Sequence, residues 1–82
     1  MNSKAIIESF FVLREGGGVV ADLYQVDLFE SGLIDSLDVV ELIVYIEKCC
    51  GVRLNLSEKE TFDSFKSANL LIDLIERKQF EI

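Results

Sequence analysis

The chain has 82 residues, half of them hydrophobic, which is enough to bury the core of one small domain. Its 15 acidic residues outnumber 8 basic ones, the formal net charge is −7, and histidine is absent. An acidic surface repels nucleic-acid phosphates, and a chain without histidine lacks the commonest base near neutral pH. We therefore expect one domain over residues 1–82 that binds no nucleic acid and is not an enzyme.

The first predicted helix runs from about residue 4 to residue 15. Its apolar residues recur at helical spacing: Ile6, Ile7, Phe10, Phe11 and Leu13. Asn2 or Ser3 can cap its start, and the Gly16-Gly17-Gly18 run ends it. No Lys-Ser/Thr pair follows these glycines, so the sequence does not indicate a phosphate-binding loop.

Residues 19–35 show no sustained period and are predicted to form a long loop with one helical turn around residues 21–26. Leu28 and Phe29 are expected to anchor this loop to the core, which argues against disorder. Residues 27–38 also partly match a calcium-binding loop, but Phe29 stands where the third oxygen ligand is required. No metal site is predicted.

The apolar run from Val39 to Cys50 predicts a central helix. One face of the helical wheel collects Val39, Leu42, Ile43, Ile46 and Cys50. The frequent β-branched residues favour a strand instead, but period-two alternation is missing and Gly51 follows as a helix-ending residue. We therefore predict a helix.

The opposite side of this helix mixes apolar and acidic residues. Its members, here called the docking face, are Leu37, Asp38, Val40, Glu41, Val44 and Glu47. Exposed apolar side chains are common on small proteins, so the pattern alone requires no function. The alternative is a surface whose apolar ridge is buried by a partner and whose acidic residues orient that partner.

The segment after the central helix, residues 52–56, alternates in polarity and is predicted to be extended, with Leu54 or Leu56 turned inward. Residues 57–60 have the spacing of a capping box, led by Ser57. A short third helix is therefore predicted to run through Phe62.

Ser64 has the position of an N-cap for a last helix, which is predicted to fray near Lys78. The inner face of that helix is expected to consist of Leu70, Leu71, Leu74 and Ile75. The whole chain is thus predicted to be all-α, with three main helices, one short third helix and a long first loop.

The two cysteines, Cys49 and Cys50, are neighbours in the predicted central helix and cannot easily pair with each other. Small buried hydrophobes in a reducing compartment are the expected interpretation. The N-terminal run is broken by Glu8 and Arg14, so neither a secretory signal nor a membrane span is predicted. We expect a cytoplasmic protein without membrane insertion, and a monomer by default.

Asp35 and Ser36 stand where the long loop becomes the central helix. Either residue could simply be the N-cap, and for an arbitrary Asp-Ser pair that is the simpler interpretation. The sequence offers no metal-ligand cluster and no serine with a plausible triad partner, so no catalytic residue is proposed.

The setting of this serine resembles a known family. The residues concerned are Gly32-Leu33-Ile34-Asp35-Ser36-Leu37, followed by Asp38, Glu41-Leu42-Ile43 and Glu47. They look like the motif of the acyl carrier protein family and its peptidyl and aminoacyl relatives, and the order of predicted helices matches that family over nearly the full chain. In that family the serine carries a covalent 4′-phosphopantetheine arm, on which the acyl group travels as a thioester.

The resemblance implies a four-helix acyl-carrier-like bundle with Ser36 as the attachment site. Asp35 would help to position the metal and coenzyme A of the modifying enzyme. The docking face would contact a phosphopantetheinyl transferase, an acyl- or aminoacyl-loading enzyme and downstream acyl-transfer enzymes.

The spacing of the motif bears on the pathway. Gly32 stands four residues before Ser36, whereas fatty-acid-synthesis carriers usually have glycine nearer the serine, and Lys48 interrupts a helix that those carriers keep more acidic. The motif is more similar to D-alanyl and aminoacyl carriers and to carriers of specialised biosynthesis than to those of housekeeping fatty acid synthesis. The alternative function is an unmodified helical interaction module, in which Ser36 only caps a helix and the acidic face binds a basic partner.

Overall fold

The computed structural model describes residues 2–80, and over that range the regular secondary structure is helical. The elements are α1 (Ser3–Glu15), the 3-10 turn η1 (Gly17–Val19), α2 (Val20–Leu23), α3 (Ser36–Cys50), α4 (Lys59–Ser64) and α5 (Ala68–Phe80). The predicted all-α class is confirmed. The long first loop is partly helical, because η1 and α2 occupy its first residues.

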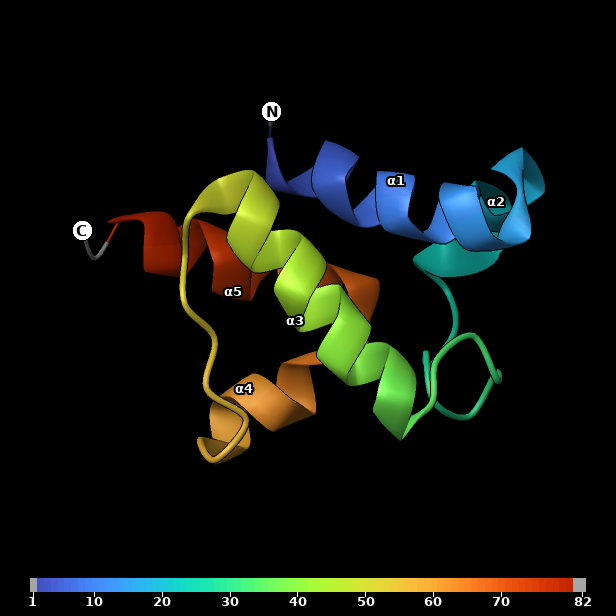
Figure 1. Ribbon diagram of the computed structural model, residues 1–82. Coiled ribbons are helices and arrows are strands. Elements are labelled where there is room, and N and C mark those ends of the chain that lie inside the picture. The colour runs from blue at the N-terminus through green and yellow to red at the C-terminus, as the bar shows by residue number, and fades with distance from the viewer. Residues whose placement is uncertain (1, 81–82) are drawn as a thin grey trace.

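Three long helices enclose the core. α1 packs against both α3 and α5, and α3 crosses in front of α5, while α4 lies below them (Figure 1). The largest side chains with no exposed surface come from all three helices and from the connections: Phe11, Ile6, Ile7, Leu23, Leu28, Leu42, Ile46, Phe65, Leu71 and Ile75. Burial of this apolar set is the main stabilising contribution to the fold.

Helix α1 begins as predicted, because the Asn2 side chain accepts a hydrogen bond from the Ala5 N–H at 2.7 Å. Of the apolar residues that recur at helical spacing, Ile6, Ile7, Phe10 and Phe11 are buried, whereas Leu13 is 77% exposed. Helical spacing gives the direction of a side chain. It does not say whether another element covers that turn.

Helix α3 buries Val39, Leu42 and Ile46 as predicted, while Ile43 and Cys50 are only partly buried. Cys49 is exposed, so the expectation that both cysteines are buried is wrong for this residue. Burial, followed by the charge of its neighbour, raises the pKa of the Cys50 thiol.

Gly51 ends α3 in the left-handed conformation, with φ of +72°, and its N–H donates to the Glu47 carbonyl. A Cβ at this position would meet no atom within 4 Å, so only the backbone conformation disfavours a side chain. We expect Gly51→Ala to lower the free energy of unfolding by about 1–2 kcal/mol, measured by urea denaturation. Gly51→Asn should cost less, because asparagine tolerates this conformation. Equal stability of the two variants would contradict this account.

The capping box predicted at residues 57–60 is wrong. Helix α4 begins after Glu58, whose side chain makes no cap bond, and the Ser57 hydroxyl instead donates to Asn55 Oδ1 at 2.8 Å. Serine competes for nearby polar groups outside a helix as readily as at its start, so the spacing alone did not decide its partner.

Ser64 does not cap the last helix either. It is the final residue of α4, which extends beyond the predicted end at Phe62, and its hydroxyl donates back to the Glu60 carbonyl at 2.8 Å. Ser67 takes the capping role, since its hydroxyl accepts from the Leu70 N–H at 3.4 Å.

Helix α5 buries Leu71, Leu74 and Ile75 as predicted, but Leu70 is exposed on its outer side. The helix also continues past Lys78 to Phe80. Two ion pairs connect its last turns to the start of α4, from Arg77 to Glu60 and from Lys78 to Glu58. None of the helices described within residues 2–80 is long and apolar enough to cross a membrane.

Candidate functional site

The loop before α3 is built from its own hydrogen bonds. Asp27 Oδ1 accepts from the N–H groups of Phe29 and Glu30, both at 2.9 Å, which closes a tight turn. Leu28 and Ile34 are buried and joined by a bond from the Ile34 N–H to the Leu28 carbonyl. The side chain of Asp27 is therefore used to shape the loop, and residues 2–80 contain no cluster of three or more potential metal ligands.

The same loop is connected to α4 and to the turn that follows it. The Leu28 N–H donates to the Lys66 carbonyl at 2.8 Å, and the ring of Phe29 stacks on Phe62 with centroids 6.2 Å apart. Residues of the first loop thus contact α4 and the turn that follows it, and these contacts hold the segment that leads into α3.

Asp35 is the N-cap of α3. Its Oδ1 accepts from the Asp38 N–H at 3.0 Å, and Asp38 Oδ2 accepts in return from the Asp35 N–H at 2.9 Å, which completes a reciprocal capping box. Ser36 is consequently the first helical residue. Its side chain is exposed and has no hydrogen-bond partner within residues 2–80.

Arg14, from the last turn of α1, reaches this capping box. Its Nη2 lies 2.5 Å from Asp38 Oδ1, its Nη1 lies 3.9 Å from Glu41, and its guanidinium lies over the Phe10 ring at 5.2 Å. Burial alone would raise the pKa of Asp38, but the Asp35 N–H and the Arg14 guanidinium outweigh it and hold that pKa below its ordinary value. Asp38 is therefore charged at neutral pH.

The apolar half of the docking face is exposed as predicted. Leu37 is 74% exposed, and Val40 and Val44 are also exposed. Two of the acidic members are used within the molecule, since Asp38 pairs with Arg14 and Glu47 Oε2 accepts from the Leu54 N–H at 3.3 Å. Glu41 is the acidic member that remains most open to solvent.

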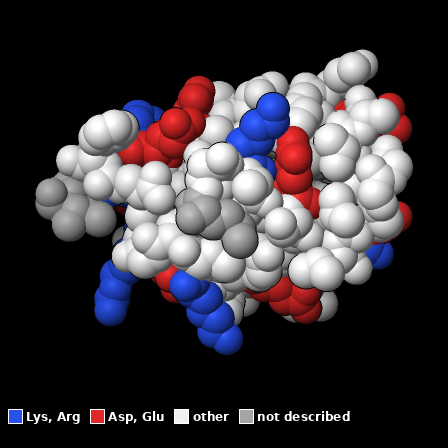
Figure 2. Space-filling model, turned by 90° about the horizontal axis from the view of Figure 1, so that it is seen from above, with Lys and Arg blue, Asp and Glu red and all other residues white. Residues whose placement is uncertain are grey.

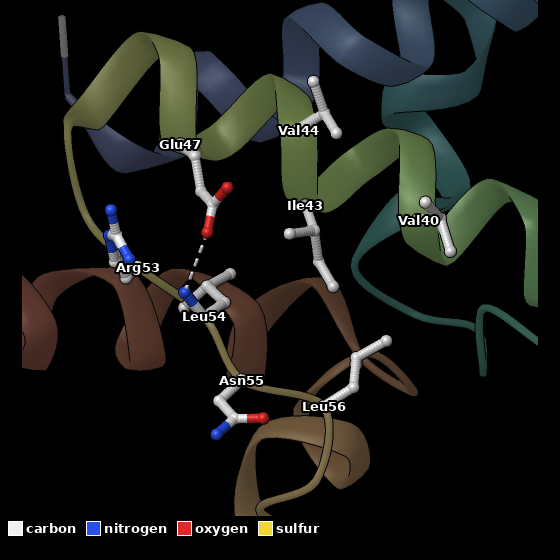
Figure 3. A pocket seen from close by; sticks show the side chains of 8 residues that line it. All are labelled: Val40, Ile43, Val44, Glu47, Arg53, Leu54, Asn55 and Leu56. Atoms are coloured by element: carbon white, nitrogen blue, oxygen red, sulfur yellow. Dashed lines mark hydrogen bonds between the residues drawn. The ribbon is translucent and has the colours of Figure 1, made fainter.

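A groove of about 580 Å³ adjoins this face, between α3 and the segment after it (Figure 3). Figure 3 shows side chains of α3 on one side and consecutive residues of the following segment on the other. They are Val40, Ile43, Val44, Glu47, Arg53, Leu54, Asn55 and Leu56. The floor is apolar because Leu54 is buried and Leu56 half-buried, which confirms the inward turn predicted for this segment.

The acidic side chains do not form one continuous patch on the face of the molecule that is seen from above (Figure 2). On the face seen in Figure 2, acidic and basic side chains are interspersed and much of the surface is uncharged. The net charge of −7 therefore does not by itself specify where a partner binds.

Comparison with known proteins decides the family. The family model described as "Phosphopantetheine attachment site" matches residues 18–75, which is more than half of the chain. The chain belongs to this family of acyl carrier proteins. It is a carrier protein that holds its cargo on a covalent 4′-phosphopantetheine arm, and this favours the carrier function over an unmodified interaction module.

Curated relatives of this carrier agree with that result. A D-alanyl carrier protein of Streptococcus equi subsp. zooepidemicus (strain MGCS10565) is 42% identical over 60 residues, covering 73% of this chain and 75% of the relative. One of Streptococcus sanguinis (strain SK36) is 37% identical over 54 residues, covering 66% and 67%. No solved structure gives a significant match. Carriers of this family are not catalytic, and their role implies partner enzymes for loading and transfer.

The surroundings of Ser36 fit a phosphodiester. The first bond within α3 runs from the Val39 N–H to the Asp35 carbonyl, so the N–H groups of Ser36 and Leu37 lie before it at the positive end of the helix dipole. Phosphate groups are stabilised at such helix N-termini. Ser36 is exposed at this end of the helix.

Two features of this carrier were missed from the sequence. Arg14 was noted only as a charge that interrupts an apolar run, and the groove beside α3 was not predicted at all. A double-aspartate capping box can be seen in the spacing of Asp35 and Asp38, but nothing local indicates which cation lies beside it. Both features arise from tertiary contacts between segments distant in the chain.

Proposed function

We propose that Ser36 carries the 4′-phosphopantetheine arm and that the chain presents an aminoacyl group, D-alanine, to partner enzymes. One observation carries the assignment of Ser36: its hydroxyl is exposed at the start of α3 while Asp35 performs the capping. Several other serines are already hydrogen-bonded. The hydroxyls of Ser31, Ser57 and Ser64, for example, each donate to an acceptor nearby in the chain.

Asp35 is proposed to serve the modifying enzyme as well as the helix. Its Oδ1 is used in the capping box, whereas its other carboxylate oxygen has no partner within residues 2–80. A carboxylate oxygen is a ligand that Mg²⁺ prefers. Asp35 can therefore hold the start of α3 with one oxygen and contact the enzyme-bound metal with the other.

The cargo is proposed from the relatives and from the motif. The relatives are named D-alanyl carrier proteins, and the position of Gly32 is similar to that of D-alanyl and aminoacyl carriers. The arm supplies a thiol that holds the cargo as a thioester. The chain's own residues present the arm and bind the enzymes that load and unload it.

The test has two stages, each with its own result. Intact mass is measured after incubation with a broad-specificity phosphopantetheinyl transferase, coenzyme A and Mg²⁺, and peptide mapping then locates the added group. We expect one phosphopantetheine unit on Ser36, and its location on another residue would overturn the site assignment. The loaded arm is next incubated with a D-alanine-activating ligase and ATP, with L-alanine as the control amino acid. Equal or preferred loading of L-alanine would overturn the proposed cargo while leaving the site intact.

The docking face is proposed to bind the phosphopantetheinyl transferase, the D-alanine-loading enzyme and the downstream acyl-transfer enzyme. The exposed apolar side chains Leu37, Val40 and Val44 support this, because they continue along α3 from Ser36. Glu41 adds a charge that can orient a basic partner, whereas Asp38 and Glu47 act mainly by holding local structure.

We predict that Leu37→Ala lowers the kcat/KM of phosphopantetheinylation about 10-fold, mainly through KM. The reason is that an apolar side chain buried on binding contributes about 1.5–3 kcal/mol, part of which alanine retains. The matched control is Leu13→Ala, since Leu13 is 77% exposed but lies on α1. The proposal fails if the two variants are modified with the same kcat/KM.

We also propose that residues 1–82 form one carrier domain and that it acts in the cytoplasm. The two cysteines are free and cannot easily pair with each other, which suits a reducing compartment. Fractionation of the native cells with an antibody against the chain tests this location.

A further inference from the structure

The capping box at the start of α3 has an unusual composition. The common box pairs a neutral serine or threonine with glutamate or glutamine, so at most one member is charged. Here both members are aspartates, and each accepts the N–H of the other at 3.0 and 2.9 Å. Two carboxylates held within one helical turn repel each other, and this repulsion opposes the geometry that presents Ser36.

Arg14 is placed to offset that repulsion. The guanidinium of Arg14 forms an ion pair with Asp38 Oδ1 at 2.5 Å, while Asp38 Oδ2 accepts a hydrogen bond from the Asp35 N–H. Both oxygens of Asp38 are therefore engaged, one by each neighbour. Contact with Glu41 is longer, at 3.9 Å, so Asp38 is the main partner of Arg14.

The pair differs from an ordinary surface ion pair. The side chain of Asp38 is only 15% exposed and that of Arg14 is 31% exposed, so solvent screens their attraction less than it screens fully exposed charges. The ring of Phe10 supports the guanidinium at 5.2 Å. Helix α1 thus holds the first turn of α3 through one fixed side chain.

We propose that Arg14 is a positioning residue for attachment of the phosphopantetheine arm: it holds the Asp38 carboxylate on the Asp35 N–H and so keeps Asp35 and Ser36 in one geometry for the modifying enzyme. The proposal rests on the assignment of Ser36 made above. Arg14 itself touches neither Ser36 nor a reacting atom.

The first experiment compares Arg14→Met with the wild-type chain in the kinetics of phosphopantetheinylation, followed by intact mass. Methionine keeps an apolar stem over Phe10 and removes the charge. We expect kcat to fall about tenfold with KM little changed, because the exposed apolar members of the docking face, Leu37, Val40 and Val44, are unaltered. Arg77→Met is the matched control, since Arg77 also forms an ion pair between two helices but at the other end of the molecule. Arg14→Lys should recover part of the rate, because lysine keeps the charge without the fork geometry.

Two further measurements separate positioning from general destabilisation. Hydrogen exchange in the unmodified protein should lose protection at the Asp35 and Asp38 amides of Arg14→Met, with α5 unchanged. In the Asp38→Asn background the box no longer contains two charges, so adding Arg14→Met should change the rate less than twofold.

The outcomes are distinguishable. Peptide mapping of the wild-type chain tests Ser36 independently of Arg14, so an arm found elsewhere refutes the site assignment. A wild-type arm on Ser36 with a wild-type rate in Arg14→Met overturns the positioning role. So does a tenfold loss that persists in the Asp38→Asn background, or a loss of exchange protection spread over all helices.

Discussion

Replacing Ser36 with alanine is expected to abolish phosphopantetheine attachment, because alanine lacks the oxygen that joins the arm. The fold should survive this change, since the hydroxyl has no partner within residues 2–80 and the helix is capped by Asp35. We expect the free energy of unfolding to change by no more than about 0.5 kcal/mol. Intact mass after incubation with transferase and coenzyme A measures the first effect, and urea denaturation measures the second.

Ser31→Ala is the control for this experiment. Ser31 lies in the loop that leads into α3, but its hydroxyl donates to the Leu28 carbonyl at 3.3 Å. This variant should gain one arm, as the wild-type chain does. An arm found on Ser36→Ala at the wild-type rate would refute the assignment, whereas loss of the arm together with loss of the folded state would show only that the substitution disrupts the fold.

Phe11→Ala is expected to cost about 3–5 kcal/mol of folding free energy. Phe11 has no exposed surface and its ring meets Phe10 edge-on, with centroids 5.4 Å apart, in the core shared by α1, α3 and α5. A domain of this length has a total stability of roughly 4–12 kcal/mol. The substitution therefore removes a large part of it and leaves a measurable unfolded fraction.

Urea denaturation followed by circular dichroism measures this loss, with Phe80→Ala as the matched control. Phe80 is 90% exposed at the end of α5, so its removal should change stability by less than about 0.5 kcal/mol. Comparable losses in the two variants would contradict the assigned core. The rate of arm attachment to Phe11→Ala should fall in proportion to its folded fraction.

The sequence predicted the parts of the fold that depend on periodicity. The helical spacing of apolar residues predicted the long helices, and Asn2 is one of the two caps predicted for the first of them. Burial near the ends of helices is harder to predict, as Leu13 and Leu70 show, because it depends on which neighbouring element covers that turn. Serine caps were also misassigned, since a hydroxyl can bond forward to an N–H or back to a carbonyl.

The residues at the start of α3 could be predicted from the sequence more fully than the residues that hold them in place. The Asp-Ser motif and the exposed positions of Leu37, Val40 and Val44 could be derived from local sequence and the helical wheel. The ion pair of Arg14 could not, because it requires the angle at which α1 passes α3. A local pattern can therefore indicate a candidate attachment site, while the residues that support its geometry are found only in the packed fold.

The hydrogen bond from the Leu28 N–H to the Lys66 carbonyl helps to hold the loop before Ser36 in place. With the arm on Ser36, as proposed, the loop before it is held from both halves of the chain and cannot swing outward without breaking that bond and the Phe29–Phe62 stack. The positions that the cargo can reach would then depend on rotation within the arm rather than on movement of the loop. An enzyme bound to the proposed docking face would hold the attachment point relative to its own active site, and so set the direction from which the arm enters.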